Sequence, residues 1–321
     1  MPRPFLIVIG ILCLLAVLAG GLNWYFSSGR TRIVTLPGWV TKAAVLAPKS
    51  LVLPRPAHVV VIIEENKSFA QIIGNVRDAP YLNALARQGA VFTHSYGIAH
   101  PSQPNYFALF AGRTNTDGDG CAVLGIPPDA DNLGAQLLRS YNTFVGYAED
   151  LPHAGFRGCF AGDYASKHVP WTHFTNIPDS SIQPLTALPG RWDQLPNVTF
   201  VIPNLLNDMH SGSIRRGDDW LRQKMGPLIA WASGHDTLIV ITWDESSAAL
   251  TNHIPTLFVG PMIAPGRYTE PITHYRVLRT LEDLYGLPHA GNAGGQTPID
   301  AVWRRPILSG RSSSLPESRP R

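Results

Sequence analysis

The chain has 321 residues, of which 45% are hydrophobic and 15% are charged. This balance is typical of a globular protein and excludes an intrinsically disordered chain. The formal net charge is only +3, so the composition gives no reason to expect a nucleic-acid partner, and we expect none.

The chain begins with an apolar segment. Residues 5–22 contain no charged side chain, and eighteen uncharged residues are near the lower limit for a membrane-spanning helix. Trp24 and Tyr25 follow, and aromatic residues are common at the membrane interface. Two interpretations of residues 1–25 remain open: an apolar helix that anchors the protein, or a signal peptide that is removed. We therefore expect a cell-membrane protein with one span and its domain outside, or a secreted protein.

The rest of the chain divides into three parts. Residues 26–56 are interrupted by prolines and predict a linker. Residues 57–308 form the predicted domain, and residues 309–321, rich in Ser, Pro and Arg, predict a disordered tail. The domain contains Cys121 and Cys159, which predict one disulfide in an exported protein, with two buried free thiols as the alternative.

Short apolar runs alternate with helical patterns along the domain. We predict strands at residues 58–63, 90–92, 198–202, 237–242 and 256–259, and helices at residues 81–88, 105–110, 218–231 and 276–285. This alternation predicts an α/β fold with a central, mostly parallel sheet and helices on both faces. In such sheets ligands bind beyond the carboxyl ends of the strands.

Polar side chains gather after three of these predicted strands. The residues are Glu64, Glu65 and Asn66, then Asn204, Asn207, Asp208 and His210, then Asp244 and Glu245. Carboxylates, amides and histidine are metal ligands, and charges beside buried strands are costly unless a cation or partner satisfies them. Each residue alone could be a helix cap or a solvated loop charge, but together they favour a metal site.

A serine stands just before the predicted helix at residues 105–110. Ser102 lies in the sequence His-Pro-Ser-Gln-Pro-Asn-Tyr. A helix N-terminus attracts anions, so a serine there could attack phosphorus, and Asn105 could donate a hydrogen bond to a phosphoryl oxygen. The alternative is that Ser102 only caps the helix.

Five motifs resemble one family when taken in order. They are Glu-Glu-Asn-x-Ser, His-Pro-Ser-x-Pro-Asn-Tyr, Pro-Asn-x-x-Asn-Asp-Met-His, Trp-Asp-Glu and Asn-His-Ile-Pro-Thr, at residues 64–68, 100–106, 203–210, 243–245 and 252–256. The sequence resembles the bacterial phosphoesterase family of acid phosphatases and phospholipases C, whose members are similar in fold to the alkaline phosphatase superfamily. The resemblance runs from about residue 58 to about residue 290.

The resemblance implies roles for individual residues. Ser102 would be the nucleophile, Asn105 would lie near the transferred phosphoryl group, and His210 or His253 would protonate the leaving oxygen. The implied metal ligands are Glu65, Asn66, Asp244 and Glu245. The implied substrate-binding residues are Lys167 and His168, which follow Tyr164 in a Tyr-x-x-Lys-His element, and Asp208.

The acidic pair differs from that of two-zinc alkaline phosphatases. Those enzymes have an Asp-His pair where this chain has Asp244 and Glu245. Glutamate is a harder ligand than histidine, so we expect one divalent ion, with Ca²⁺, Mg²⁺ or Mn²⁺ favoured over Zn²⁺. The remaining histidines would replace the charge of a second metal, which predicts an acidic or near-neutral pH optimum.

The implied activity is hydrolysis of phosphomonoesters through a phosphoseryl intermediate. A phospholipase C-type phosphodiesterase acting on membrane lipid is an alternative, because it would use the same core site. A third possibility is an inactive, membrane-anchored module that binds phosphoesters. The expected partners are a phosphoester substrate, which could be a phospholipid, and the membrane.

Overall fold

The computed structural model describes residues 53–247 and 250–304. The apolar helix predicted within residues 1–25, most of the predicted linker and the predicted tail lie outside these residues. Within the described ranges, every helix is too short or too polar to cross a lipid bilayer.

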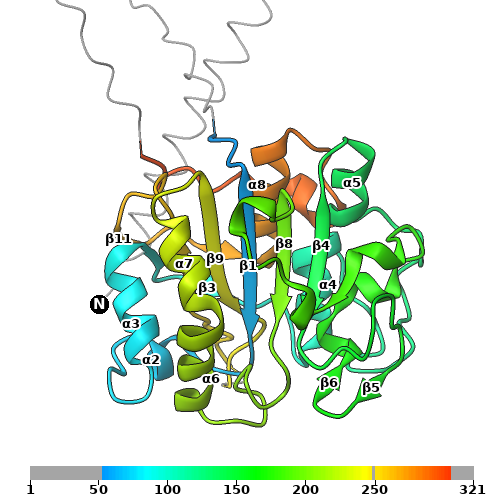
Figure 1. The fold of residues 1–321 in the computed structure, drawn as a ribbon, viewed down its shortest axis with the longest axis horizontal. Helices are drawn as coiled ribbons and strands as arrows, with labels where there is room; N and C mark the ends of the chain where they lie inside the picture. The colour runs from blue at the N-terminus through cyan, green and yellow to red at the C-terminus, as the bar shows by residue number, and fades with distance from the viewer. Residues whose placement is uncertain (1–52, 248–249, 305–321) are drawn as a thin grey trace, which may run out of the picture. The chain divides into compact units, whose positions relative to one another are not determined.

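The described residues contain a sheet of eight strands in the order β11-β2-β10-β9-β1-β8-β4-β7 (Figure 1). The strands are β1 (His58–Glu64), β2 (Ala90–Phe92), β4 (Phe144–Ala148), β7 (Ile182–Pro184), β8 (Val198–Ile202), β9 (Thr237–Trp243), β10 (Thr256–Val259) and β11 (Gly266–Tyr268). Neighbouring strands pair in parallel, except that β10 runs antiparallel to β9 and β2. The predicted mostly parallel sheet is confirmed, although its direction change at β10 was not predicted.

Helices cover the sheet and connect its strands. They are α2 (Phe69–Ile72), α3 (Pro80–Gln88), α4 (Gln103–Ala111), α5 (Leu133–Arg139), α6 (Ile214–Trp220), α7 (Gly226–Ala232) and α8 (His274–Tyr285). Short 3₁₀ helices lie at Ser166–His168, Pro170–His173, Asp179–Ser181, Leu185–Ala187, Trp192–Gln194 and Gly291–Gly295. Two small strand pairs complete the secondary structure, β3 (Ser95–Tyr96) with β12 (Ile272–Thr273) and β5 (Phe160–Ala161) with β6 (Tyr164–Ala165).

Strand β1 divides the core into two layers. Successive side chains of a strand point to opposite faces, so Val59 and Val61 pack in one hydrophobic cluster and Val60 and Ile62 in another. The first cluster includes residues of α4, α5 and α8, and the second includes residues of α3, α6 and α7. Figure 1 shows the second set in front of the sheet. The prediction of helices on both faces is confirmed.

The helix predicted at residues 218–231 differs in its start and its continuity. Helix α6 begins at Ile214, because the Ser213 side chain caps it by accepting a hydrogen bond from the Arg216 amide over 3.2 Å. A π-helical turn at Leu221–Met225 then separates α6 from α7. Pro227 has no N–H to donate, so the α-helical hydrogen-bond pattern cannot continue through it.

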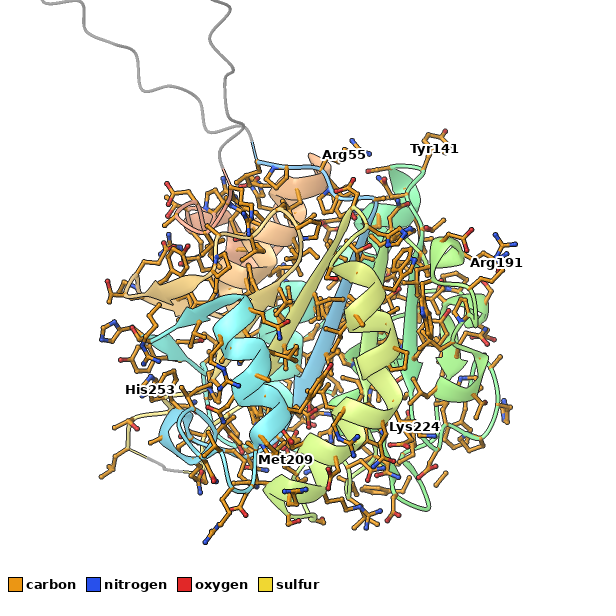
Figure 2. All side chains as sticks on the ribbon, turned by 60° about the vertical axis from the view of Figure 1, so that its left-hand side comes forward. Arg55, Tyr141, Arg191, Met209, Lys224 and His253 are labelled. Atoms are coloured by element: carbon orange, nitrogen blue, oxygen red, sulfur yellow. A yellow bond between two sulfur atoms is a disulfide. The ribbon has the colours of Figure 1, made fainter. Side chains whose placement is uncertain are left out.

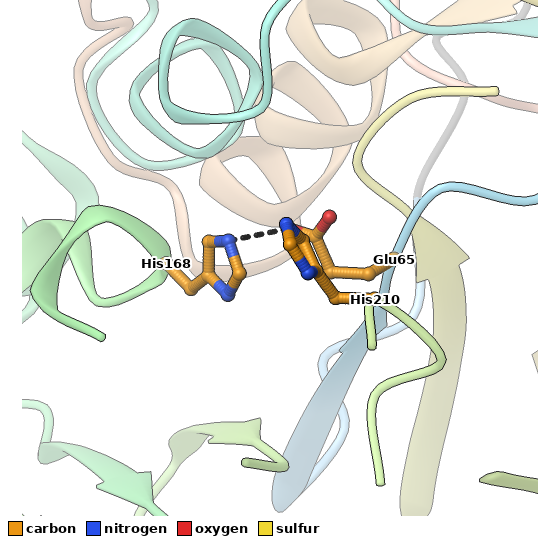
Figure 3. Close-up of side chains that lie close together, drawn as sticks. All are labelled: Glu65, His168 and His210. Atoms are coloured by element: carbon orange, nitrogen blue, oxygen red, sulfur yellow. Dashed lines mark ion pairs between the residues drawn. The ribbon is translucent and has the colours of Figure 1, made fainter. Parts of the chain in front are cut away.

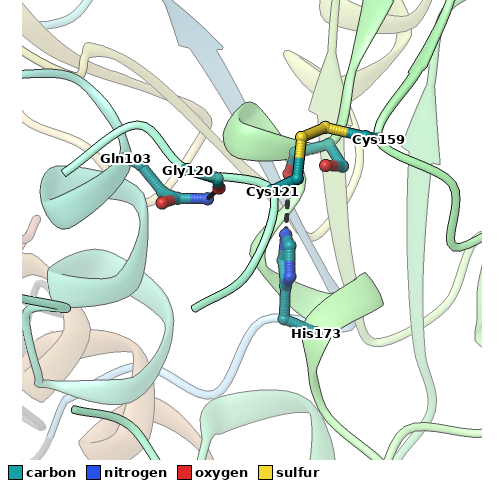
Figure 4. Close-up of a disulfide and its surroundings, with 6 residues drawn as sticks. Gln103, Gly120, Cys121, Cys159 and His173 are labelled. Atoms are coloured by element: carbon teal, nitrogen blue, oxygen red, sulfur yellow. Dashed lines mark hydrogen bonds between the residues drawn. A yellow bond between two sulfur atoms is a disulfide. The ribbon is translucent and has the colours of Figure 1, made fainter. Parts of the chain in front are cut away.

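The two cysteines of the domain form a disulfide. Cys121 and Cys159 are joined with their Cα atoms 5.4 Å apart (Figure 4). The predicted disulfide is therefore confirmed over two free thiols. It connects the loop between α4 and α5 to the start of the β5–β6 hairpin.

Candidate active site

The polar residues that follow β1, β8 and β9 come together because these strands are neighbours in the sheet. Main-chain hydrogen bonds extend the pairing past the strand ends. The Glu65 amide donates to the Asp208 carbonyl over 2.7 Å, and the Asp244 amide donates to the Glu64 carbonyl over 3.0 Å. Three segments far apart in the sequence thus present their carboxylates at one edge of the sheet.

Ser102 joins this edge from the start of α4. Its hydroxyl oxygen lies 3.1 Å from Glu65 Oε2 and 3.3 Å from Glu245 Oε1. All three side chains are buried. The hydroxyl therefore lies within hydrogen-bond distance of carboxylates that follow two different strands.

Asn66 connects Glu65 to a third carboxylate, that of Asp244. It has a φ of 53°, a left-handed conformation that asparagine tolerates better than most residues. In this conformation its amide N–H donates to Asp244 Oδ1 over 3.1 Å, and its Nδ2 donates to Glu65 Oε2 over 2.8 Å. Ser102, Glu65, Asn66, Asp244 and Glu245 are thus brought together.

The arrangement leaves a buried oxygen of Asp244 unsatisfied. Among the described residues, Asp244 Oδ2 has no hydrogen-bond partner. Burial and the negative charges of Glu65 and Glu245 raise the pKa of Asp244 well above its ordinary value. Buried carboxylates crowded in this way are stabilised by a cation, and an oxygen-rich set fits Mg²⁺, Mn²⁺ or Ca²⁺.

Glu245 has a histidine partner that the sequence did not reveal. His100 Nδ1 lies 2.6 Å from Glu245 Oε2. Burial, followed by the charge of Glu65, raises the pKa of Glu245 to about 7. The only sequence signal for His100 was its place two residues before Ser102, and this does not predict a contact with a residue so distant in the chain.

His168 lies deeper, between two carboxylates. Its Nε2 is 2.9 Å from Glu65 Oε1, and its Nδ1 is 3.3 Å from Asp208 Oδ2. The ring stacks on Tyr106 at 5.0 Å, and the Tyr106 hydroxyl donates to Glu65 Oε1 over 2.7 Å. Burial alone would lower the pKa of His168, but the charge of Glu65 and hydrogen bonds to Asp208 and Glu65 raise it to about 9.

Glu65, His168 and His210 form a group that could hold a metal ion. One ligand atom of each lies within 4.8 Å of the others (Figure 3). The rings of His168 and His210 are 5.6 Å apart. His210 is partly exposed, and its backbone N–H donates to Asp208 Oδ1 over 2.7 Å.

Two other predicted residues make contacts elsewhere. Asn105 Oδ1 accepts from the amides of Ile98 and Ala99 over 2.7 and 3.0 Å, and its Nδ2 donates to carbonyls of the same loop. His253, labelled in Figure 2, stacks on Phe69 at 4.7 Å, and its Nε2 is 2.9 Å from the Thr93 carbonyl. Asn105 thus holds the loop before Ser102, and the structure does not bring His253 to the group around Ser102.

Lys167 forms an ion pair with Asp119, which in turn accepts the backbone N–H of Gln103, the residue after Ser102. Its ammonium is 2.7 Å from Asp119 Oδ2. Among the predicted site residues, Ser102, Glu65, Asn66, Asp244, Glu245, His168, Asp208 and His210 are connected by the contacts described above. A buried hydroxyl among carboxylates, with histidine and lysine nearby, is suited to attack on an anionic ester.

Comparisons with known proteins agree with this chemistry. A model of the Phosphoesterase family matches residues 75–288. The phosphatidylinositol-3-phosphatase of Mycobacterium tuberculosis is 44% identical over 306 residues, a match that covers 94% of this chain and 96% of that protein. The phosphate-repressible acid phosphatase of Penicillium chrysogenum is 29% identical over 229 residues, which cover 65% of this chain and 55% of that protein.

The fold has relatives among solved structures. A protein in the alkaline phosphatase superfamily from Vibrio parahaemolyticus matches with a TM-score of 0.56 at 15% identity, and the match covers 78% of this chain and 72% of that chain. The fold is therefore alkaline-phosphatase-like. The family match and the identity with the phosphatases agree in showing that this chain belongs to the Phosphoesterase family and is a hydrolase acting on phosphoric ester bonds.

Proposed function

We propose that this protein hydrolyses phosphate monoesters in two steps, with Ser102 as the nucleophile and one divalent cation as cofactor. One observation carries the proposal. The Ser102 hydroxyl lies within hydrogen-bond distance of Glu65 and Glu245, at the sheet edge where Asn66 and Asp244 also meet. A serine that only caps a helix would donate to no such pair of carboxylates, and the Ser102 side chain makes no capping hydrogen bond to α4.

The four side chains around Ser102 would hold the cation. Glu65, Asn66, Asp244 and Glu245 supply oxygen ligands, and the unpartnered Oδ2 of Asp244 fits this role. When bound, the ion would lower the pKa of the Ser102 hydroxyl and withdraw charge from the phosphoryl oxygens.

In the first step, Ser102 Oγ forms a bond to phosphorus while the bond to the ester oxygen breaks. The Ser102 proton passes to solvent water, and His210 gives a proton to the departing oxygen. In the second step, water attacks the phosphoserine and gives a proton to His210, while Ser102 leaves phosphorus and recovers a proton from solvent. Inorganic phosphate is released, and every group returns to its initial state.

Positive charge at this site comes from the chain as well. Both ring nitrogens of His168 face carboxylates, at 2.9 Å and 3.3 Å. An imidazole can donate to both only when it is protonated. The imidazolium of His168 would therefore take the place of a second metal ion, with Lys167 adding a further charge.

A phosphorylated lipid is the substrate class that we favour. The Mycobacterium tuberculosis relative is named for phosphatidylinositol 3-phosphate, and it matches this chain over nearly its whole length. The apolar segment at residues 5–22 would place the domain at the outer side of the membrane or deliver it outside the cell. A phosphate monoester on an inositol lipid would then be within reach of the site.

A substrate panel tests the reaction type. p-Nitrophenyl phosphate, its bis-ester, phosphatidylcholine vesicles and vesicles containing phosphatidylinositol 3-phosphate are compared at acidic and neutral pH. We expect phosphate release from the two monoesters and little turnover of the diesters. Faster cleavage of the bis-ester or of phosphatidylcholine would favour a phospholipase C, and binding without any turnover would favour an inactive module.

A further inference from the structure

Asp119 bridges Lys167 and the backbone of Gln103. Its Oδ1 accepts the backbone N–H of Gln103 over 2.9 Å, and its Oδ2 accepts a hydrogen bond from Lys167 Nζ over 2.7 Å. Gln103 follows Ser102 directly and is the first residue of α4. A single carboxylate thus connects the start of the nucleophile's helix to the nearby lysine.

The loop that carries Asp119 is fastened to α4 and to the disulfide. The Gln103 side chain donates to the Gly120 carbonyl over 3.0 Å and accepts from Asn115 Nδ2 over 2.7 Å. Cys121, the next residue after Gly120, is bonded to Cys159 (Figure 4). These contacts leave Asp119 little freedom to move away from α4.

The same disulfide reaches the segment that carries Lys167. The Cys159 carbonyl accepts the backbone N–H of Ser166 over 2.9 Å. Lys167 follows in the 3₁₀ helix that begins at Ser166. A disulfide and an ion pair therefore join the segment of Asp119 to the segment of Lys167. The first segment contacts Gln103, which follows Ser102, and the second contacts Glu65 through His168.

The ion pair is partly exposed to solvent. The side chain of Lys167 is 15% exposed and that of Asp119 is 30% exposed. Both charges act on His210, whose pKa is lowered mainly by burial. The pair is thus close enough to influence the site electrostatically, and open enough for an anionic substrate to reach Lys167.

We propose that Asp119 is a positioning residue: its carboxylate, held by the first amide of α4, orders the Lys167 ammonium so that the ammonium stabilises charge on the transferred phosphoryl group. This inference rests on the proposed function. A lysine has a long, flexible stem, and fixing it before the substrate arrives removes an entropic cost from the transition state. Asp119 would act only through Lys167.

A double-mutant cycle tests the proposal. Asp119→Ala, Lys167→Met and the double variant are purified with bound metal, and kcat and KM are measured with p-nitrophenyl phosphate. We expect Asp119→Ala to lower kcat/KM by about tenfold to a hundredfold, and to cause almost no further loss when Lys167 is already replaced. If Asp119→Ala lowers kcat/KM equally in the wild type and in Lys167→Met, or if it raises kcat/KM, the proposal is overturned.

Two more variants separate positioning from folding. Asp119→Asn keeps one acceptor oxygen, so we expect a smaller loss, together with weaker competitive inhibition by inorganic phosphate. Asp179→Ala is the matched control, because Asp179 pairs with Arg157 at 3.2 Å near the same disulfide, away from Ser102. We expect Asp179→Ala to keep the wild-type kcat/KM, and an equal loss there would show a general structural effect.

The wild-type protein distinguishes the two hypotheses. If it does not hydrolyse any phosphoester, the proposed function fails. If the wild-type protein hydrolyses phosphoesters, and Asp119→Ala and Asp119→Asn have the same kcat, KM and phosphate inhibition as the wild type, only the role of Asp119 is refuted.

Discussion

Two regions of different construction meet at Ser102. On one side, β1, β8 and β9 are almost completely buried and deliver their carboxylates by the ends of parallel strands. On the other side, the residues between α4 and β8 contain several 3₁₀ helices and a disulfide. The strand-end side of the site therefore depends on packing spread over many residues, whereas the loop side depends on a few hydrogen bonds, ion pairs and one disulfide.

Those few bonds are visible around the disulfide. The Arg157 guanidinium donates to three carbonyls, those of Thr172, Phe174 and Ile177, at 2.7 to 3.0 Å. Asp119 pairs with Lys167. A segment held in this way can be disturbed by one substitution without loss of the sheet. The comparison thus predicts that variants of the two regions will affect activity and stability in different proportions.

Ser102→Ala removes the hydroxyl at which the two regions meet, and we expect it to cause the largest loss of activity. Loss of the nucleophile should lower kcat by about a thousandfold or more, because the covalent pathway is removed. The melting temperature should change little. Ser95→Ala is a matched control that also removes a buried hydroxyl, one that lies 2.7 Å from Thr256 Oγ1, and it should keep the wild-type kcat. Near-wild-type turnover by Ser102→Ala would remove Ser102 from the proposed role.

Removing the metal tests the strand-end side alone. Dialysis against a chelator should abolish hydrolysis of p-nitrophenyl phosphate, and adding back Mg²⁺, Mn²⁺ or Ca²⁺ should restore it. Elemental analysis should find one ion per chain in the active protein, while thermal denaturation shows that the sheet remains folded. Activity that persists in a verified metal-free sample would contradict the cation site.

Breaking the disulfide tests the loop side alone, and we expect the smallest effect on catalysis. Replacing Cys121 and Cys159 by serine should lower the free energy of unfolding by about 2–5 kcal/mol. It should also reduce kcat/KM far less than Ser102→Ala does, because only the restraint on Asp119 and Lys167 is weakened. Denaturant unfolding and steady-state kinetics measure both effects. Unchanged stability and kcat/KM in the double variant would show that the bond does not restrain this side.

The strand-end side was readable from the sequence because its signals are local. Uninterrupted β-branched runs predicted β1, β8 and β9, and the acidic residues directly after β1 and β9 marked the site. Strand direction is not encoded in a four-residue run, so the antiparallel β10 could not be foreseen. The helical spacing of residues 105–110 placed Ser102 just before a helix, and the family resemblance implied its role. The contacts with Glu65 and Glu245 came from the structure.

The loop side was hidden because its contacts are long-range. Strand β4 was missed since Gly146 interrupts its apolar run, yet a Cβ there would lie 2.1 Å from the Trp171 ring. Packing against a distant tryptophan therefore demands the glycine. For the same reason, nothing local to His100 or Tyr106 indicated their contacts with Glu245 and Glu65.

Helix α4 has a consequence for how the family can vary. All nine of its residues are buried, so the helix that presents Ser102 is packed on every side and cannot tilt to suit a new ligand. We therefore expect relatives that accept other molecules to differ in the surrounding loops rather than in α4. A rigid reaction centre surrounded by variable loops would let one scaffold act on different phosphoesters.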